Sequence, residues 1–230
     1  MSGQTVVLVR HAQASFGSDD YDRLSPTGQT QACRLGEWMA ESGIAPTTVV
    51  IGPRRRHRDT AERCLATAGI DLPLQVMPEL DEVDHVELLK RLRPDLRDGD
   101  ALRAELRTHD DPQRAFQRIF EQAIARWMSG TYDDEYAVSW PGFRNHVQAA
   151  LAQLADMKGP VWAFTSGGPI GVLAGSAVGL PIEQGFRMSW PLLNTSLNRL
   201  RIGKRGATLV GYNAWPHLER HDLQSLLTMR

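Results

Sequence analysis

The strongest constraint on the fold is a set of short, continuous apolar runs without regular polar alternation. They are TVVLV at 5–9, TTVVIG at 47–52 and VWAF within GPVWAFTSGG at 159–168. A strand with one face in water alternates apolar and polar residues, whereas a strand covered on both faces is apolar throughout. The runs therefore predict buried strands of a sheet that has helices on both sides.

The first two runs are each followed by a helical pattern. In the segment 24–43, Ser25 predicts the N-cap, Pro26 the first helical residue and Gly43 the end of the helix. The segment 53–69 begins with proline, spaces its apolar residues on one helical face and ends in glycine. Strands that alternate with helices imply right-handed crossovers and a largely parallel sheet.

The rest of the chain extends this pattern. We expect a short strand at 74–77, mostly helical structure over 80–157, a helix at 169–179, a hairpin over 196–213 and a short helix near 221–228. The predicted fold class is α/β, with three layers (α/β/α) around a central, mostly parallel sheet. We interpret residues 1–230 as a single domain with a helical insertion at about 83–140.

Composition is that of an ordinary globular protein. The 230 residues are 42% hydrophobic and 23% charged, and the net charge is −1. This balance gives no bulk attraction to nucleic acid or to an anionic membrane, so we expect neither as a partner. Cys33 and Cys64 lack the CxxC spacing and the number typical of a disulfide scaffold, and the first ten residues contain no basic leader. We therefore expect reduced thiols and a cytoplasmic location.

Chemically distinctive residues follow three of the predicted strands. They are Arg10 and His11, the basic run 54–58, and the serine and glycines at 166–168. Ligands of parallel sheets bind beyond the carboxyl ends of the strands, so these three groups are expected to converge. Arginine suits phosphate oxygens, and a neutral histidine can attack phosphorus to form a phosphohistidine.

The basic run 54–58 lies at a helix N-terminus, where cations oppose the helix dipole unless an anion is present. An anion site resolves this conflict, and the alternatives are a solvated basic cluster and, more weakly, a nucleic-acid patch. The loop at 166–168 could either hold an oxyanion or form a plain strand-to-helix turn.

Asp81, Glu82, Asp84 and Glu87 form an acidic stretch in which one carboxyl group could act as a general acid. The combination of Asp84, His85 and Glu87 matches no defensible metal-ligand spacing, and we predict no metal and no cofactor.

Taken together, these motifs resemble the histidine phosphatase (phosphoglycerate mutase-like) superfamily, whose first strand ends in RHG or RHA. The resemblance continues through LSPTGQTQA (24–32, like LSxxGxxQA), GPRRRHRDTAE (52–62, like SPxxRxxxTA) and LDE (80–82, like LxE). It implies that His11 is the nucleophile and Glu82 the proton donor. It also implies that Arg10 and Arg56 bind the phosphoryl oxygens.

The resemblance breaks where the family has HGG after a later strand, because this chain has Ser166, Gly167 and Gly168. The family's histidine contacts the transferred phosphoryl group, and losing one such donor can cost roughly 100- to 1,000-fold in rate. Ser166 and Gly167 are the candidate phosphate ligands here, with serine as a neutral donor. A shorter segment after His11, and Gly17 where the glycolytic mutases carry asparagine, make a mutase the least favoured function.

Two interpretations remain open at this point. The first is hydrolysis of a small phosphomonoester through a phosphohistidine, without a metal. The second is a non-catalytic member of the same family that binds phosphate or a phosphorylated ligand. The sequence does not identify the substrate, and a homodimer formed through exposed helices or the hairpin edge is compatible with it.

Overall fold

The computed structural model describes residues 3–15, 22–96 and 98–229. The chain divides into two compact units, one formed by Met1–Glu82 with His146–Arg230 and the other by Val83–Asn145. The residues that the family resemblance assigns to the site, which are Arg10, His11, Arg56, Glu82, Ser166 and Gly167, lie in the first unit.

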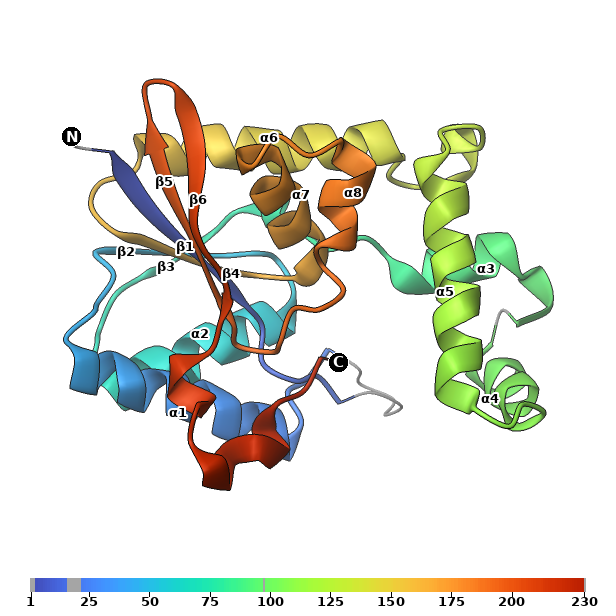
Figure 1. The fold of residues 1–230 in the computed structure, drawn as a ribbon, viewed down its shortest axis with the longest axis horizontal. Coiled ribbons are helices and arrows are strands. Elements are labelled where there is room, and N and C mark those ends of the chain that lie inside the picture. The colour runs from blue at the N-terminus through green and yellow to red at the C-terminus, as the bar shows by residue number, and fades with distance from the viewer. Residues whose placement is uncertain (1–2, 16–21, 97, 230) are drawn as a thin grey trace. The chain divides into compact units, whose positions relative to one another are not determined.

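The described strands of the first unit form one six-stranded sheet in the order β3-β2-β4-β1-β5-β6 (Figure 1). The strands are β1 (Gln4–Arg10), β2 (Thr48–Ile51), β3 (Leu74–Val76), β4 (Val161–Thr165), β5 (Leu197–Gly203) and β6 (Gly206–Ala214). Strands β3, β2, β4 and β1 are parallel, while β5 and β6 are antiparallel to their neighbours. The prediction of a mostly parallel sheet is confirmed.

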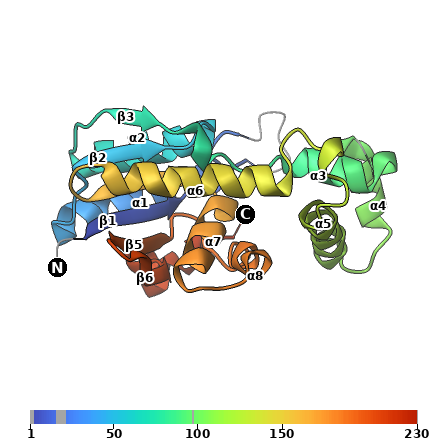
Figure 2. The same ribbon diagram turned by 90° about the horizontal axis from the view of Figure 1, so that it is seen from above.

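Helices cover both faces of this sheet. Helices α1 (Pro26–Ser42) and α2 (Arg55–Ala68) lie on one face, and α7 (Gly167–Ala177) lies on the other beside α6 (Trp140–Asp156) (Figures 1 and 2). This is the three-layer α/β/α arrangement expected from the sequence. The short helix α8 (Ile182–Arg187), which follows α7, was not predicted.

Local signals set the ends of the first two helices. The Ser25 side chain accepts a hydrogen bond from Gly28 N at the start of α1, and Gly43 ends that helix in the left-handed conformation. The predicted boundaries of α1 are confirmed. Helix α2 begins at Arg55 rather than at Pro53, because Arg54 is still extended and serves as the N-cap without a side-chain cap.

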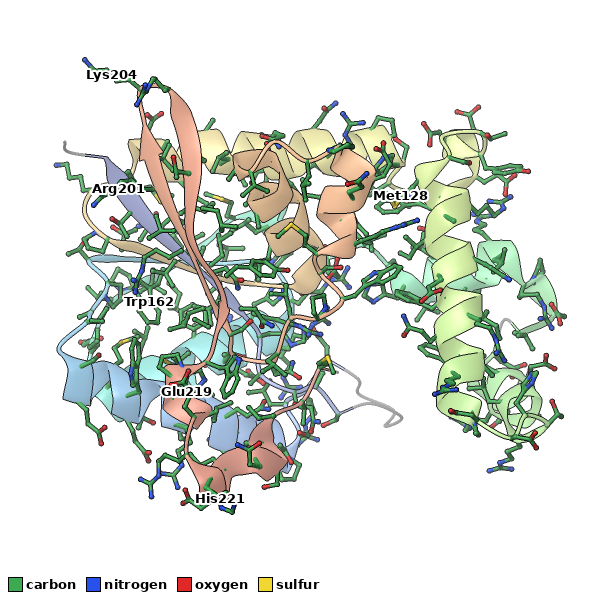
Figure 3. The ribbon with its side chains drawn as sticks, viewed as in Figure 1. Met128, Trp162, Arg201, Lys204, Glu219 and His221 are labelled. Carbon is green, nitrogen blue, oxygen red and sulfur yellow. The ribbon has the colours of Figure 1, made fainter. Side chains whose placement is uncertain are left out.

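The core of the first unit forms because the central strands are apolar on both faces. Strand β4 is buried along its whole length, and so are Val6–Val9 of β1. Trp162 of β4 packs with Phe164 and with side chains of α1 and α2 in a single apolar cluster (Figure 3). The burial of the strands on both faces, predicted from their lack of alternation, is confirmed.

The C-terminal part of the first unit is the predicted hairpin followed by short 3₁₀ segments. Lys204 marks the tip of the β5–β6 hairpin (Figure 3). The 3₁₀ segments are Pro216–Leu218 and His221–Leu226. The second of them coincides with the predicted short helix near 221–228, although it is of the 3₁₀ type.

The second unit is helical in its described part. Its helices are α3 (His85–Leu92), α4 (Gly99–Arg107) and α5 (Pro112–Met128), followed by the start of α6. Each of the first three begins with an aspartate whose side chain caps the helix N-terminus. Trp127, Trp140 and Phe143 form a buried aromatic group in this unit, with ring centroids 5.0 to 6.2 Å apart. In the described residues no helix has both the length and the apolar character that a membrane crossing requires.

Candidate active site

The three chemically distinctive strand ends lie at one edge of the sheet. Strands β2, β4 and β1 are neighbours and parallel, so their carboxyl ends meet there. His11 N donates to Thr165 O over 2.9 Å, and Arg56 Nη2 lies 3.5 Å from Ser166 Oγ. The structure thus brings together the residues that follow all three strands.

His11 is held as a neutral imidazole of defined tautomer. Its Nδ1 lies 2.8 Å from the carbonyl oxygen of Ala12, which can only accept, so Nδ1 carries the hydrogen and Nε2 keeps its lone pair. Burial, together with the guanidinium groups of Arg56 and Arg10, holds the pKa of His11 well below its ordinary value. The Nε2 atom is therefore available as a nucleophile at neutral pH.

The main chain around His11 is anchored from two sides. Ala12 N donates to Thr60 Oγ1 over 3.0 Å, which ties the end of β1 to α2. On the other side, Asn194 Nδ2 donates to His11 O over 3.0 Å, and Thr195 N donates to Arg10 O over the same distance. These bonds fix the position from which the imidazole projects.

Thr195 has a φ of 60°, an uncommon conformation for a β-branched residue. Its hydroxyl donates to Asn194 O over 2.6 Å, so it must accept from His217 Nε2, which lies 2.8 Å away. His217 is buried, and the sequence analysis assigned it no role. A residue in a sparsely populated backbone conformation is strained, and it keeps that conformation only where surrounding contacts hold it. The hydrogen bonds of Thr195 are such contacts, beside the candidate site.

Arg56 is buried in the first turn of α2 and pairs with a carboxylate that the sequence analysis missed. Its Nη1 lies 2.7 Å from Asp22 Oδ1, and the other oxygen of Asp22 accepts from Arg55 N over 2.6 Å. An anion at this helix N-terminus was expected from the basic run, and a side chain of the protein itself lies there. That expectation was the one signal that could have pointed to Asp22.

Arg10 donates to main-chain carbonyl groups at the edge of the site. Its guanidinium contacts Leu192 O, and its Nη2 lies 2.7 Å from Met229 O. The segment that carries Met229 is itself held to the unit, because Asn194 N donates to Thr228 O over 2.8 Å. The C-terminal segment therefore lies against the arginine that the family resemblance assigns to phosphate.

Glu82 is buried beside the start of α7. Its Oε2 accepts from Gly168 N over 3.0 Å, and its main-chain oxygen accepts from Arg54 Nη2 over 2.9 Å. Arg54 also pairs with Asp81 Oδ1 at 2.5 Å, so Asp81 is occupied with holding this turn. Of the acidic stretch, Glu82 is the carboxyl group that lies against the Ser166–Gly168 loop.

Ser166 is the N-cap residue of α7, but its side chain makes no capping bond. Instead its hydroxyl shares a hydrogen bond of 2.7 Å with Nε2 of His57, a fully buried residue of the α2 first turn. Burial, then the adjacent Arg56, hold the pKa of His57 well below its ordinary value. The sequence analysis treated His57 only as part of a basic run and missed this contact.

The remaining candidates lie elsewhere. Asp84 caps α3 through Val86 N and Glu87 N, so its carboxylate has a structural role in the second unit. Among the described residues no group of three or more His, Cys, Asp or Glu side chains is arranged to hold a metal ion. Gly17, which separates this chain from the glycolytic mutases, lies outside the described residues.

The fold places this chain among the α/β proteins whose ligands bind at the carboxyl edge of a parallel sheet. A family model, the histidine phosphatase superfamily (branch 1), matches residues 6–91 and 87–214. The chain belongs to that superfamily. A comparison with curated proteins found no match.

Solved structures of similar fold include three enzymes that act on small phosphorylated compounds. They are phosphoserine phosphatase from Entamoeba histolytica in complex with phosphoserine (14% identity, TM-score 0.64, covering 94% of this chain and 99% of that one), a mycobacterial glucosyl-3-phosphoglycerate phosphatase (19%, 0.62, 93% and 100%), and phosphoglycerate mutase from Bacillus anthracis (15%, 0.60, 94% and 96%). At these identities the likeness establishes the fold, which phosphatases and a mutase share.

Proposed function

We propose that this protein is a phosphomonoesterase that works through a phosphohistidine on His11. One observation carries the proposal: a neutral imidazole, held by Ala12 with its Nε2 lone pair available, lies beside the buried guanidinium of Arg56. Such a pair combines a nucleophile for phosphorus with a fixed positive charge for the phosphoryl oxygens.

The reaction has two balanced steps. Nε2 of His11 attacks the phosphorus, the bond to the alcohol oxygen breaks, and protonated Glu82 gives its proton to that leaving oxygen. Water then attacks the phosphohistidine, the Glu82 carboxylate takes the proton from the water, and the N–P bond breaks. The products are the alcohol and inorganic phosphate, and both side chains return to their first state.

Charge stabilisation falls to the arginines and to donors at the start of α7. Phosphoryl transfer needs mainly positioning and neutralisation of the equatorial oxygens, which guanidinium groups can supply without a metal. For Arg10 to serve in this way, its bonds to the carbonyl groups of Leu192 and Met229 must be exchanged for bonds to phosphate. The substrate class proposed is a small phosphomonoester.

The test is a steady-state assay of the wild type, His11→Ala and Glu82→Gln on an aryl phosphate and a panel of alkyl phosphomonoesters, with chelator present. We expect metal-independent turnover in the wild type and none above background in His11→Ala. We also expect Glu82→Gln to lose roughly 100- to 10,000-fold on alkyl phosphates. The loss should be smaller on the aryl phosphate, whose leaving group needs less protonation.

A variant of the exposed His221, His221→Gln, is the matched control for loss of an imidazole and should keep full activity. Turnover that persists in His11→Ala would overturn the phosphohistidine route. An absence of wild-type turnover, with saturable phosphate binding that depends on Arg56, would instead favour the non-catalytic binding protein.

A further inference from the structure

Ser166 directs its hydroxyl away from the helix that it begins. A serine at an N-cap commonly accepts a hydrogen bond from an N–H group of the first turn. Here the side chain makes no such bond, and Gly168 N donates to Oε2 of Glu82 instead. The hydroxyl is therefore available for another task, and it lies between Arg56 Nη2 at 3.5 Å and His57 Nε2 at 2.7 Å.

His57 is a second imidazole close to His11, the candidate nucleophile. The ring centroids of His57 and His11 are 5.8 Å apart, and His57 is fully buried. A buried imidazole nitrogen is retained at little cost only when it has a hydrogen-bond partner. The partner of His57 Nε2 is the hydroxyl of Ser166, whereas Nδ1 has no hydrogen-bond partner among the described residues. The two residues are 109 positions apart in the chain, so the fold alone brings them together.

The His57 ring occupies space that a side chain at position 52 would need. A Cβ atom built on Gly52 would lie 2.4 Å from His57 Nδ1 and 2.7 Å from the main-chain oxygen of Leu80, distances at which the neighbouring atoms would have to shift. In the family pattern SPxxRxxxTA, position 52 is the serine. Glycine at position 52 therefore leaves room for the His57 ring, and serine at position 166 is the partner of that ring's Nε2.

We propose that His57 is a positioning residue for phosphoryl transfer: it holds the Ser166 hydroxyl as a donor to the phosphoryl group and replaces, through serine, the imidazole that the family pattern has at position 166. The inference rests on the proposed function. When His57 Nε2–H donates to Ser166 Oγ, the serine O–H can point to a phosphoryl oxygen. A fixed donor aimed at developing charge stabilises the transition state more than the bound substrate.

The experiment compares two replacements of His57 that fill similar space. Glutamine places an amide near the position of Nε2 and can still donate to Ser166, whereas leucine cannot. We expect His57→Leu to lower kcat by roughly 10- to 100-fold, toward the effect of removing one donor, with KM changed less than about 3-fold. His57→Gln should recover a large part of that kcat.

Two further variants separate this role from a packing role. Ser166→Ala should also lower kcat. The double variant His57→Leu/Ser166→Ala should have about the same kcat as the less active of the two single variants, because the pair acts as one unit. The variant His57→Ala/Ser166→His moves the imidazole to position 166, and we expect it to exceed His57→Ala in kcat by at least about 10-fold. Thermal melts of all variants report the packing contribution separately.

The results of these experiments distinguish a failure of the role of His57 from a failure of the proposed function. Suppose that turnover depends on His11. Equal kcat in the wild type and His57→Leu would then overturn the role of His57, and so would losses that add in the double variant. Either result would leave the proposed function intact. If His57→Leu does not fold, His57→Ala with Ser166→Ala closes the same cycle, and additive losses there overturn the inference. If the wild type has no turnover, the proposed function fails and this inference fails with it.

Discussion

His217 should make the stability of this protein fall as the pH falls below about 6.5. The hydroxyl of Thr195 fixes the hydrogen on Nε2 of His217, and Nδ1 is buried with no hydrogen-bond partner in the described structure. Burial lowers the pKa of His217 from 6.5 to about 3, because the charged imidazole would be removed from bulk water.

The sign and size follow from proton linkage. Between pH 3 and 6.5 the unfolded chain binds a proton at this residue and the folded chain does not, so stability rises with pH and is complete above 6.5. Acidification from pH 7.5 to pH 5 should therefore cost about 2 kcal/mol through His217 alone, at a limiting slope of about 1.4 kcal/mol per pH unit.

The perturbation is His217→Gln, which can still donate to Thr195 but cannot titrate. Urea unfolding at pH 7.5 and at pH 5 gives the free energy of unfolding of the variant and the wild type. We expect the variant to lose about 2 kcal/mol less than the wild type between the two pH values, whatever its cost at pH 7.5. His221→Gln, which removes an exposed imidazole, is the control. Equal losses in His217→Gln and the wild type would refute the reasoning.

Two further predictions concern residues that the site or its supporting loop depends on. Asp22→Asn removes the ion pair with Arg56 and keeps atoms that can form hydrogen bonds. Inorganic phosphate should therefore bind roughly 3- to 10-fold more tightly to this variant, as measured by calorimetry. Weaker binding than to the wild type would contradict this. In Gly28→Ala the new Cβ atom would lie 2.1 Å from Gln13 O. The free energy of unfolding, measured in urea, should therefore fall by about 2 to 3 kcal/mol. An unchanged urea midpoint would show instead that the main chain at Gln13 moves away without cost.

Most of the fold could be predicted because its signals are local. The continuous apolar runs fixed the buried strands, and Ser25, Pro26 and Gly43 fixed the ends of α1. The start of α2 was predicted two residues early, because the first helical residue was assigned to Pro53 while Arg54 is still extended. The helix α8 has only six residues and lacks a side-chain cap, so no sequence signal marked it.

Residues of the candidate site could be predicted only where a strand end or a sequence motif identified them. His11, Arg56, Glu82 and Ser166 each follow a recognisable pattern, and the structure gathers them at one edge. The supporting contacts were missed because they join distant segments: Asp22 to the start of α2, and Thr195 to the end of β1. His57 was hidden in a run of arginines, and only the three-dimensional contact with Ser166 distinguishes it from them.

The crowding of Gly52 by His57 also couples the effects of substitutions at the two positions. With a side chain at position 52, the Cβ atom would lie 2.4 Å from His57 Nδ1 and 2.7 Å from Leu80 O, so the ring and the main chain of Leu80 would both have to move. Gly52→Ala should therefore destabilise the wild-type chain more than it destabilises the variant His57→Ala, in which Leu80 O is the close contact that remains.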